Sequence, residues 1–353
     1  MAEQNKTSII KVEGDIQRSE TQLRINPKQA PRNVIEGTDD SDILFGTPGN
    51  DDIFAKGGDD TIIGTLGDDS INGGDGFDTL DYTKLGQKIT LLPQGLIGNG
   101  SSQGSQIQSI ERIIGASKKD NTIDGSGTKD SPVFFTIDLS DNLLVVENIP
   151  RLGSVKFVVE NFVNVEATEN SDSITGNNRN NKLSGNGGDD NLIGKFGNDT
   201  LIGGSGNDTL TGADPSRKDT VGAEKDVLTG GNGGDKFVLG NELGSFYDDF
   251  GNNDFAKITD FSFGDQINLG SGEKYNIQRT KQGFNIFVVE DSVNDLIGRI
   301  TFGTSITSTM NSSMRSESGA LMTSNSEMIV DLNDISESST IKFDEQTGFN
   351  VVS

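Results

Sequence analysis

An aspartate recurs at every ninth residue between Gly37 and Asp81, and the spacing does not change. Two residues after each aspartate stands an aliphatic residue, and two residues before most of them stands a glycine. A unit with so little apolar surface cannot bury a core alone, so the units must stack and share one. The period therefore predicts an all-β solenoid of short parallel strands. The aspartates of this first block are Asp42, Asp51, Asp60, Asp69 and Asp78.

A second block with the same period runs from Ala167 to Val238. Its broken unit, Gly212 to Lys225, contains Pro215, Arg217 and Lys218, which suit an exposed loop. If this unit fills a whole coil, Asp208 lies beside Asp226 in the next coil and pairs with it. If it bulges out, Asp199 pairs with Asp226 and Asp208 with Asp235, and the sequence leaves both arrangements open. The pattern positions of the block are Asp172, Asn181, Asp190, Asp199, Asp208, Asp226 and Asp235.

Stacking brings like charges into rows. Adjacent strands lie about 4.8 Å apart, and two carboxylates at that distance repel by about 3.5 kcal/mol at an effective dielectric constant of about 20. Domains are stable by only about 5–15 kcal/mol, so several such pairs would prevent folding unless cations lie between them. A cage of carboxylate and carbonyl oxygens suits Ca²⁺ better than Mg²⁺. The alternative is an ion-free solenoid that uses Asp and Asn only as turn residues.

The last unit of the first block matches the nonapeptide G-G-x-G-x-D-x-U-x, in which U is a large apolar residue; it is Gly73-Gly74-Asp75-Gly76-Phe77-Asp78-Thr79-Leu80-Asp81. The chain thus resembles the RTX family, whose hemolysin-type repeats bind calcium in a parallel β-roll. The resemblance implies that one coil uses two nonapeptides, so that alternate aspartates share a side. It implies Ca²⁺ sites at the pairs Asp42–Asp60, Asp51–Asp69, Asp60–Asp78, Asp172–Asp190 and Asp190–Asp208, with Asn181–Asp199 as a weaker pair. By the same resemblance, backbone carbonyls complete the sites, for example at Gly64, Gly73, Gly203 and Gly230.

Composition predicts six segments. They are a polar N-terminal tail (1–33), the first repeat block (34–81), an irregular β-solenoid or small β segment (82–166), the second repeat block (167–238), a capping β region (239–302), and a Ser/Thr-rich linker with an acidic tail (303–353). Within the third segment, Asn121 and Ile123 keep the aspartate and aliphatic positions of a degenerate repeat. This favours a continuing solenoid over the alternative, a separate small β-sandwich.

The sequence from Ile258 to Leu269 resembles the D-F-x-x-G-D-x-I-x-L segment that ends the β-roll of secreted RTX proteases. A cap is needed because the last coil would otherwise expose an open sheet edge. Strand-like runs at 284–289 and 296–302 are expected to complete it. A carbohydrate-stacking surface is the alternative interpretation of the aromatic residues after Val238.

The composition bounds the partners and the location. The net charge of -25 disfavours binding to nucleic acid and to anionic membrane surfaces. Residues 1–33 have no long apolar run, and we expect neither a signal peptide nor a membrane span there. The resemblance implies an extracellular protein exported by type I secretion machinery, and the ending Phe349–Ser353 is compatible with the C-terminal signal of that route. A cell-surface or matrix polysaccharide is a candidate partner.

No catalytic residue is predicted. The chain has no histidine and no cysteine, which excludes Ser-His-Asp triads, H-E-x-x-H helices and thiolate sites. Gly100–Gly104 fits G-x-S-x-G, but without histidine it is a loop sequence. Because 46 glycines and only 31% hydrophobic residues approach a disordered composition, we expect the metal-free chain to be unfolded. Two functions stay open: a secreted calcium-binding β-roll with a structural, surface or matrix role, or a polysaccharide-modifying enzyme with a carboxylate cluster in 82–166.

Overall fold

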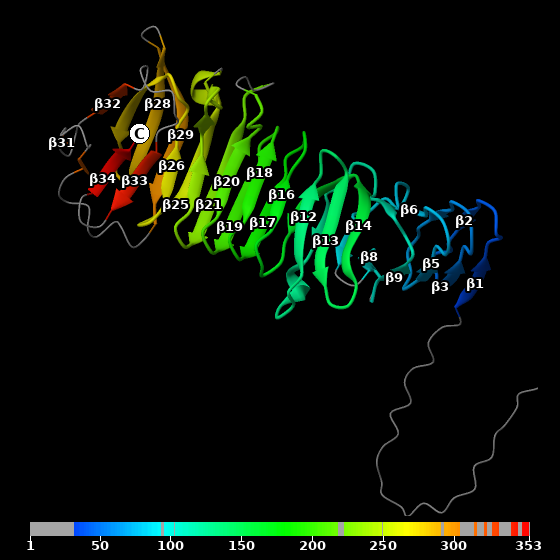
Figure 1. Ribbon diagram of the computed structural model, residues 1–353. Helices are drawn as coiled ribbons and strands as arrows, with labels where there is room; N and C mark the ends of the chain where they lie inside the picture. The colour runs from blue at the N-terminus through cyan, green and yellow to red at the C-terminus, as the bar shows by residue number, and fades with distance from the viewer. Residues whose placement is uncertain are drawn as a thin grey trace, which may run out of the picture. The chain divides into compact units, whose positions relative to one another are not determined.

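The computed structural model describes residues 32–92, 95–101, 103–217, 222–248, 250–290 and 293–303, together with five short strand segments between 314 and 352. Residues 1–31, which include most of the expected tail, lie outside the described part. Among the described residues the strands form two large sheets (Figure 1). Two single-turn 3₁₀ helices, Ser126–Thr128 and Gly251–Asn253, are the other regular elements. No described helix has the length and apolar character needed to cross a membrane.

Sheet 1 has 16 strands. In spatial order they are β1 (Asn33–Glu36), β3 (Asp51–Phe54), β5 (Ser70–Asn72), β9 (Ser105–Gln108), β8 (Leu96–Gly98), β7 (Thr90–Leu92), β11 (Asn121–Asp124), β15 (Phe162–Glu166), β17 (Lys182–Gly187), β19 (Thr200–Ser205), β21 (Lys225–Asn232), β25 (Phe255–Phe261), β29 (Val293–Phe302), β28 (Gly283–Glu290), β27 (Lys274–Arg279) and β32 (Glu327–Asp331).

Sheet 2 has 14 strands. They are β2 (Ile43–Phe45), β4 (Thr61–Ile63), β6 (Thr79–Asp81), β10 (Arg112–Ile114), β14 (Gly153–Glu160), β13 (Leu143–Ile149), β12 (Phe134–Asp138), β16 (Ser173–Thr175), β18 (Asn191–Lys195), β20 (Thr209–Ala213), β22 (Lys236–Val238), β26 (Gln266–Asn268), β33 (Thr340–Asp344) and β34 (Gly348–Val352). Two separate two-stranded ribbons are β23 (Gly240–Asn241) with β24 (Gly244–Ser245), and β30 (Met314–Arg315) with β31 (Leu321–Met322).

Successive strands of the repeat blocks alternate between the two sheets. Leu183 of β17 pairs in parallel with Leu201 of β19 in sheet 1, and Leu192 of β18 pairs with Leu210 of β20 in sheet 2. One coil therefore uses two nonapeptides, and the predicted parallel β-roll is confirmed. The turn glycines supply the positive φ angles that this tight winding requires, as at Gly188 with φ of 95°.

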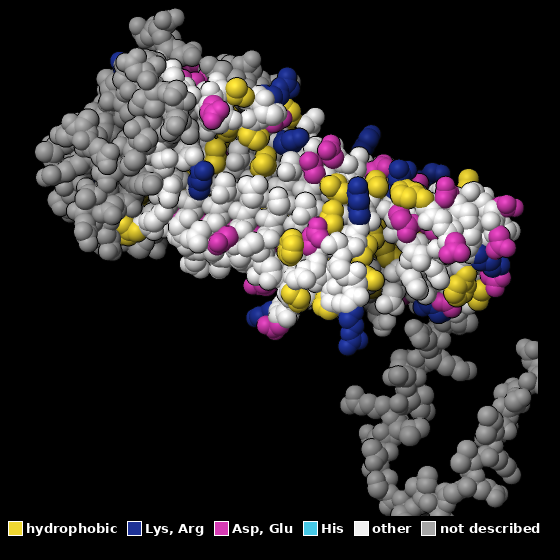
Figure 2. Space-filling view, viewed as in Figure 1, with side chains coloured by type: hydrophobic (Ala, Val, Ile, Leu, Met, Phe, Trp, Pro, Cys, Tyr) yellow, Lys and Arg dark blue, Asp and Glu magenta, His cyan; other side chains and the backbone are white. Residues whose placement is uncertain are grey.

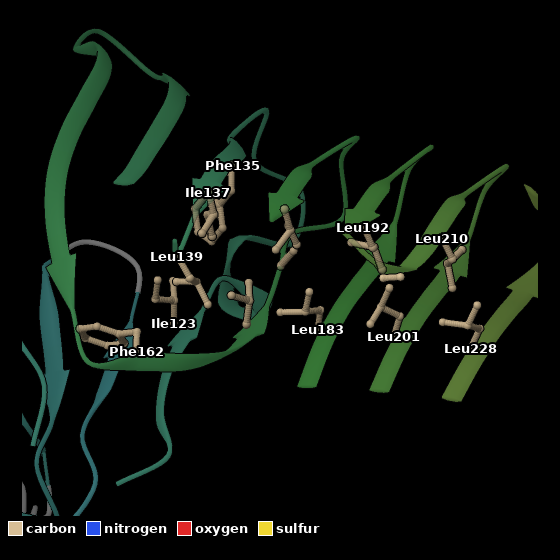
Figure 3. Close-up of a cluster of buried hydrophobic side chains, with 14 of the residues drawn as sticks. Ile123, Phe135, Ile137, Leu139, Phe162, Leu183, Leu192, Leu201, Leu210 and Leu228 are labelled. Carbon is tan, nitrogen blue, oxygen red and sulfur yellow. The ribbon is translucent and has the colours of Figure 1, made fainter. Parts of the chain in front are cut away.

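The aliphatic residues of both sheets point into one narrow core. Leu183, Leu201 and Leu228 from sheet 1 face Leu192 and Leu210 from sheet 2 (Figure 3), and all five are fully buried. Each coil adds only one side chain from each sheet to this row. The core is therefore continuous along the solenoid, and a single coil cannot be stable alone.

The broken unit bulges out of the solenoid. Leu201 pairs with Leu228, and Leu210 pairs with Phe237. In both sheets the paired residues are therefore one nonapeptide further apart in the sequence than elsewhere in the block. In the bulge, the guanidinium of Arg217 lies over the ring of Phe196, at 5.7 Å from its centroid. Of the two arrangements that the sequence left open, the structure has the one in which Asp199 pairs with Asp226 and Asp208 pairs with Asp235.

Both sheets run through the irregular segment. Antiparallel excursions widen the coils there: β7, β8 and β9 form one in sheet 1, and β12, β13 and β14 form one in sheet 2. Parallel pairing continues on either side, for example between β10 and β6 and between β11 and β15. Asn121 and Ile123 of β11 are buried, as a repeat unit requires.

The C-terminal region closes the open end of the roll. In sheet 1, β29 pairs in parallel with β25, and β28, β27 and β32 follow it in antiparallel order. In sheet 2, β33 pairs antiparallel with β26, so residues 340–344 extend the sheet beyond the expected cap. The rings of Phe237, Phe261 and Phe284 contact one another in the core beneath, which makes these aromatics core residues.

Candidate metal centre

The aspartates of each sheet form a ladder along the turns that precede the strands. In each step one carboxylate oxygen, Oδ1, accepts the backbone N–H of the aspartate one coil earlier. Asp208 Oδ1 accepts from Asp190 N at 2.8 Å, and Asp190 Oδ1 accepts from Asp172 N at 2.7 Å. The same bond joins Asp42–Asp60, Asp51–Asp69, Asp60–Asp78, Asn181–Asp199, Asp199–Asp226 and Asp208–Asp235. The structure thus brings all the predicted pairs into contact.

The second carboxylate oxygen, Oδ2, divides the aspartates into two groups. In six of the described aspartates it is buried and has no hydrogen-bond partner: Asp60, Asp78, Asp190, Asp199, Asp208 and Asp235. A buried charged oxygen without a partner costs several kcal/mol. These six positions therefore require a ligand or a proton.

In the other group Oδ2 has a partner: Ser105 Oγ donates to that of Asp69 at 3.2 Å, and threonines donate to those of three more aspartates. Thr38 and Thr47 donate their backbone N–H to Asp42 Oδ2 and Asp51 Oδ2, both at 2.6 Å. Thr168 does the same for Asp172 at 2.8 Å. These threonines stand four residues before their aspartates, in the first coils of each block. Asp42, Asp51 and Asp172 are therefore less in need of a cation than the six aspartates whose Oδ2 has no partner.

A glycine opens the space beside the unpartnered oxygen of Asp78, Asp190, Asp199, Asp208 and Asp235. A Cβ atom at Gly203 would clash with Asp208 Oδ2 and lie 2.6 Å from the carbonyl oxygen of Gly230. A Cβ at Gly185 would clash with Asp190 Oδ2 and lie 2.7 Å from the carbonyl oxygen of Gly203. The glycine thus lets a carboxylate and a carbonyl from the next coil approach the same point. The predicted carbonyls of Gly203 and Gly230 border such points.

The first block differs at two of the predicted carbonyls. A Cβ at Gly64 would clash with the ring of Tyr82, which is fully buried there. A Cβ at Gly73 would meet Asp78 Oδ2 and the carbonyl oxygen of Ser109 instead. Whether the carbonyls of Gly64 and Gly73 bind an ion stays a prediction.

Burial sets the protonation of the ladder. Removal from water, with the charges of neighbouring carboxylates, raises the pKa of Asp190 and of Asp199 to about 8. Removal from water also raises the pKa values of Asp172 and Asp208, to about 6. Without a cation these groups would bind protons near neutral pH. A divalent cation stabilises the ionised form and removes this cost.

The donor set fits a hard cation. Within the described part of the chain, no three carboxylates converge closely enough to hold an ion by themselves. Each gap between turns instead offers one or two carboxylates and the carbonyl oxygens of glycine turns. Mixed carboxylate and carbonyl oxygen ligands in an irregular arrangement are the coordination that Ca²⁺ accepts.

The ladder includes three carboxylates that the sequence pattern did not predict. Glu111 Oε2 accepts from Asp78 N at 2.8 Å, and Asp265 Oδ1 accepts from Asp235 N at 2.9 Å. Glu224 accepts the N–H of Gly197 through Oε1, while its buried Oε2 has no partner. Glu111 and Asp265 follow stretches that do not keep the period of nine, so only the strand register reveals them.

A tyrosine closes one end of the ladder in sheet 1. The hydroxyl of the fully buried Tyr247 donates to Asp226 Oδ2 at 2.6 Å. The tyrosine hydroxyl lies beside Asp226 Oδ2 in the way that, at Gly203, a backbone carbonyl from the next coil lies beside Asp208 Oδ2. Tyr247 therefore supplies Asp226 with a neutral partner where the ladder meets the cap.

Four copies of the RTX calcium-binding nonapeptide repeat match this chain, at residues 32–62, 45–80, 166–201 and 184–214. These two blocks are RTX repeats. RTX repeats bind Ca²⁺, so the chain is a calcium-binding β-roll protein. The RTX ladder continues beyond the matched ranges to Asp226, Asp235 and Asp265, because the coils retain their register there.

Solved structures also match the chain. The extracellular lipase LipA from Serratia marcescens is 17% identical, over 74% of this chain and 37% of the lipase, with a TM-score of 0.25. The chain thus spans little more than a third of that lipase's length. No curated protein matches the sequence.

Proposed function

We propose that this protein is secreted and folds outside the cell when calcium binds its two RTX blocks, and that the folded roll has a structural, surface or matrix role. The six buried carboxylate oxygens without partners carry the proposal. A chain that must bury them can do so only when ions or protons neutralise them. Calcium binding therefore becomes part of the free energy of folding.

Export follows from the same coupling. Where calcium is scarce, the carboxylates of each ladder repel one another, so the chain stays unfolded and can pass through a type I transporter. Where calcium is abundant, the ions bind between the carboxylates and the chain folds. On the face seen in Figure 2, acidic, basic and apolar side chains are interspersed. The charges that need calcium lie instead in the turns, where the ladder aspartates are nearly all buried.

The test is circular dichroism in EGTA and again in millimolar calcium. We expect little β structure in EGTA and a full β spectrum after calcium is added. Equal β content in both would refute calcium-dependent folding. The extracellular location is tested separately, by the distribution of the protein between the cells and the medium.

The alternative, a polysaccharide-modifying enzyme in residues 82–166, has less support. A cavity of about 620 Å³ lies between the two antiparallel excursions. Its lining is mainly aliphatic and aromatic, and Asp124 is the one carboxylate among the described lining residues. Glycoside hydrolysis generally uses a pair of carboxylates on either side of the scissile bond. The cavity lacks that pair, so we favour the structural role.

A further inference from the structure

The strand register places Glu111 in an aspartate position of sheet 2. Leu80 of β6 pairs in parallel with Ile113 of β10. Asp78 stands two residues before Leu80, and Glu111 stands two residues before Ile113. Glu111 thus occupies, one coil after Asp78, the position that Asp78 occupies one coil after Asp60. The family match ends at residue 80 and does not include it.

The side chain of Glu111 makes the ladder bond of that position. Its Oε2 accepts the backbone N–H of Asp78 at 2.8 Å, as Asp78 Oδ1 accepts that of Asp60 at 2.9 Å. Asp78 is fully buried, and its Oδ2 has no hydrogen-bond partner. An unpartnered carboxylate oxygen therefore lies beside the turn that Glu111 completes.

A backbone carbonyl borders the same space. A Cβ atom at Gly73 would clash with both Asp78 Oδ2 and the carbonyl oxygen of Ser109. Ser109 has a φ of 50°, a left-handed conformation that non-glycine residues seldom adopt. The gap thus has the oxygen donors found at Gly203: a carboxylate from one coil and a carbonyl from the next.

Negative charges surround Asp78. The charged groups that act most on its carboxyl are the carboxylates of Asp60, Glu111 and Asp59. Arg112, the base that follows Glu111 in the sequence, makes other contacts. Its guanidinium lies over the ring of Phe77 at 5.4 Å from the centroid, and its Nε is 3.5 Å from Glu160.

We propose that Asp78 and Glu111 hold a calcium ion between them, with the carbonyl of Ser109 as a further ligand. This site lies outside the nine-residue repeats and joins the first block to the irregular segment. It extends the proposed function, because it requires that the RTX ladders bind calcium at all. Its consequence is that calcium orders residues 82–110 as well as the repeats.

The experiment counts bound calcium in the full chain by native mass spectrometry. Glu111→Gln keeps the size of the side chain and an acceptor for the Asp78 N–H but removes the charge. We expect it to bind one ion fewer than the unmodified chain. Glu111→Asp should keep the count, because aspartate is the usual residue of this position. Glu166→Gln, an exposed glutamate at the end of β15, is the matched control and should also keep the count.

Three outcomes separate the ideas. An unchanged count in Glu111→Gln overturns the Asp78–Glu111 site while the RTX ladders still bind. A chain that binds no calcium overturns the proposed function and this site together. If Glu111→Gln does not fold, crystals of the unmodified chain grown with calcium decide: an anomalous peak between Asp78 and Glu111 supports the site, and a water molecule or no peak there overturns it.

Discussion

Replacing Asp190 with asparagine tests whether the ladder is held by ions. Asp190 lies between Asp172 and Asp208 in the middle of the second block. The amide keeps an oxygen that accepts the N–H of Asp172, so the hydrogen-bond ladder persists. Only the charge at this position is lost. The substitution therefore separates the electrostatic role of the aspartate from its role as an acceptor.

The magnitude follows from the stacking. With strands about 4.8 Å apart, each neighbour contributes about 3.5 kcal/mol of repulsion at an effective dielectric constant of about 20, and two neighbours give an upper limit of about 7 kcal/mol. Proton uptake relieves part of this, since the pKa of Asp190 is about 8. At pH 9 without calcium, we expect the substitution to raise the free energy of unfolding by about 2 kcal/mol or more.

With calcium the sign reverses. Each weakened site removes about 2.7 kcal/mol when the free calcium concentration is one hundred times the dissociation constant. Asp190 takes part in two pairs, so the substitution should lower the stability of the calcium-loaded protein by about 3–5 kcal/mol. Opposite signs in the two conditions are expected only if charge and cation act at the same position.

Urea unfolding followed by circular dichroism measures both values. In EGTA, where the chain is mainly unfolded, folding induced by trimethylamine N-oxide gives the comparison. Asp189→Asn is the control: Asp189 is exposed and adjacent, and its substitution should change stability by less than about 0.5 kcal/mol. No change in stability for Asp190→Asn in either condition would show that the ladder acts through hydrogen bonds alone, and a loss of the same size in both conditions would also refute the electrostatic argument.

Two further predictions concern the glycine turns and pH. Gly203→Ala should lower the stability of the calcium-loaded protein by about 1–3 kcal/mol in urea unfolding, because its Cβ would clash with Asp208 Oδ2. Gly222→Ala is the control and should have little effect, because the space around Gly222 is open. Equal losses in the two variants would contradict the role given to Gly203. In EGTA, stability should fall as pH rises from about 4 to 8, because the folded pKa of Asp199 is about 8 and the unfolded value is about 3.9. In calcium, stability should instead fall as the pH is lowered, because protons displace the ion. Calorimetry measures stability over both pH series, and the same trend with and without calcium would contradict this prediction.

Beyond the repeats, the sequence predicted little of the ladder. Glu111 follows a stretch of irregular spacing, and no count of nine leads from Asp78 to it. The chain forms the excursion of β7, β8 and β9 between Leu80 and Ile113, which pair in sheet 2. Only strand pairing, a long-range property, determines which carboxylate follows Asp78.

The sequence by itself determined the β-roll and its demand for cations. A fixed period of nine with one apolar residue per unit allows stacking and little else, and stacking aligns the aspartates whatever the other details. The register beyond each break was decided by the tertiary structure. Asp199 faces Asp226 because the extra unit bulges outward and lets Leu201 pack beside Leu228 in the core.

Tertiary structure also decided which aspartates need an ion. Asp69 and Asp60 have the same place in the repeat, yet Ser105 of β9 donates to Oδ2 of the first at 3.2 Å while Oδ2 of the second is buried without a partner. Tyr247 likewise reaches Asp226 from beyond the last repeat, 21 residues further along the chain. Local sequence sets where a carboxylate stands, but the atoms that surround it come from neighbouring coils, whose identity depends on how the whole solenoid winds.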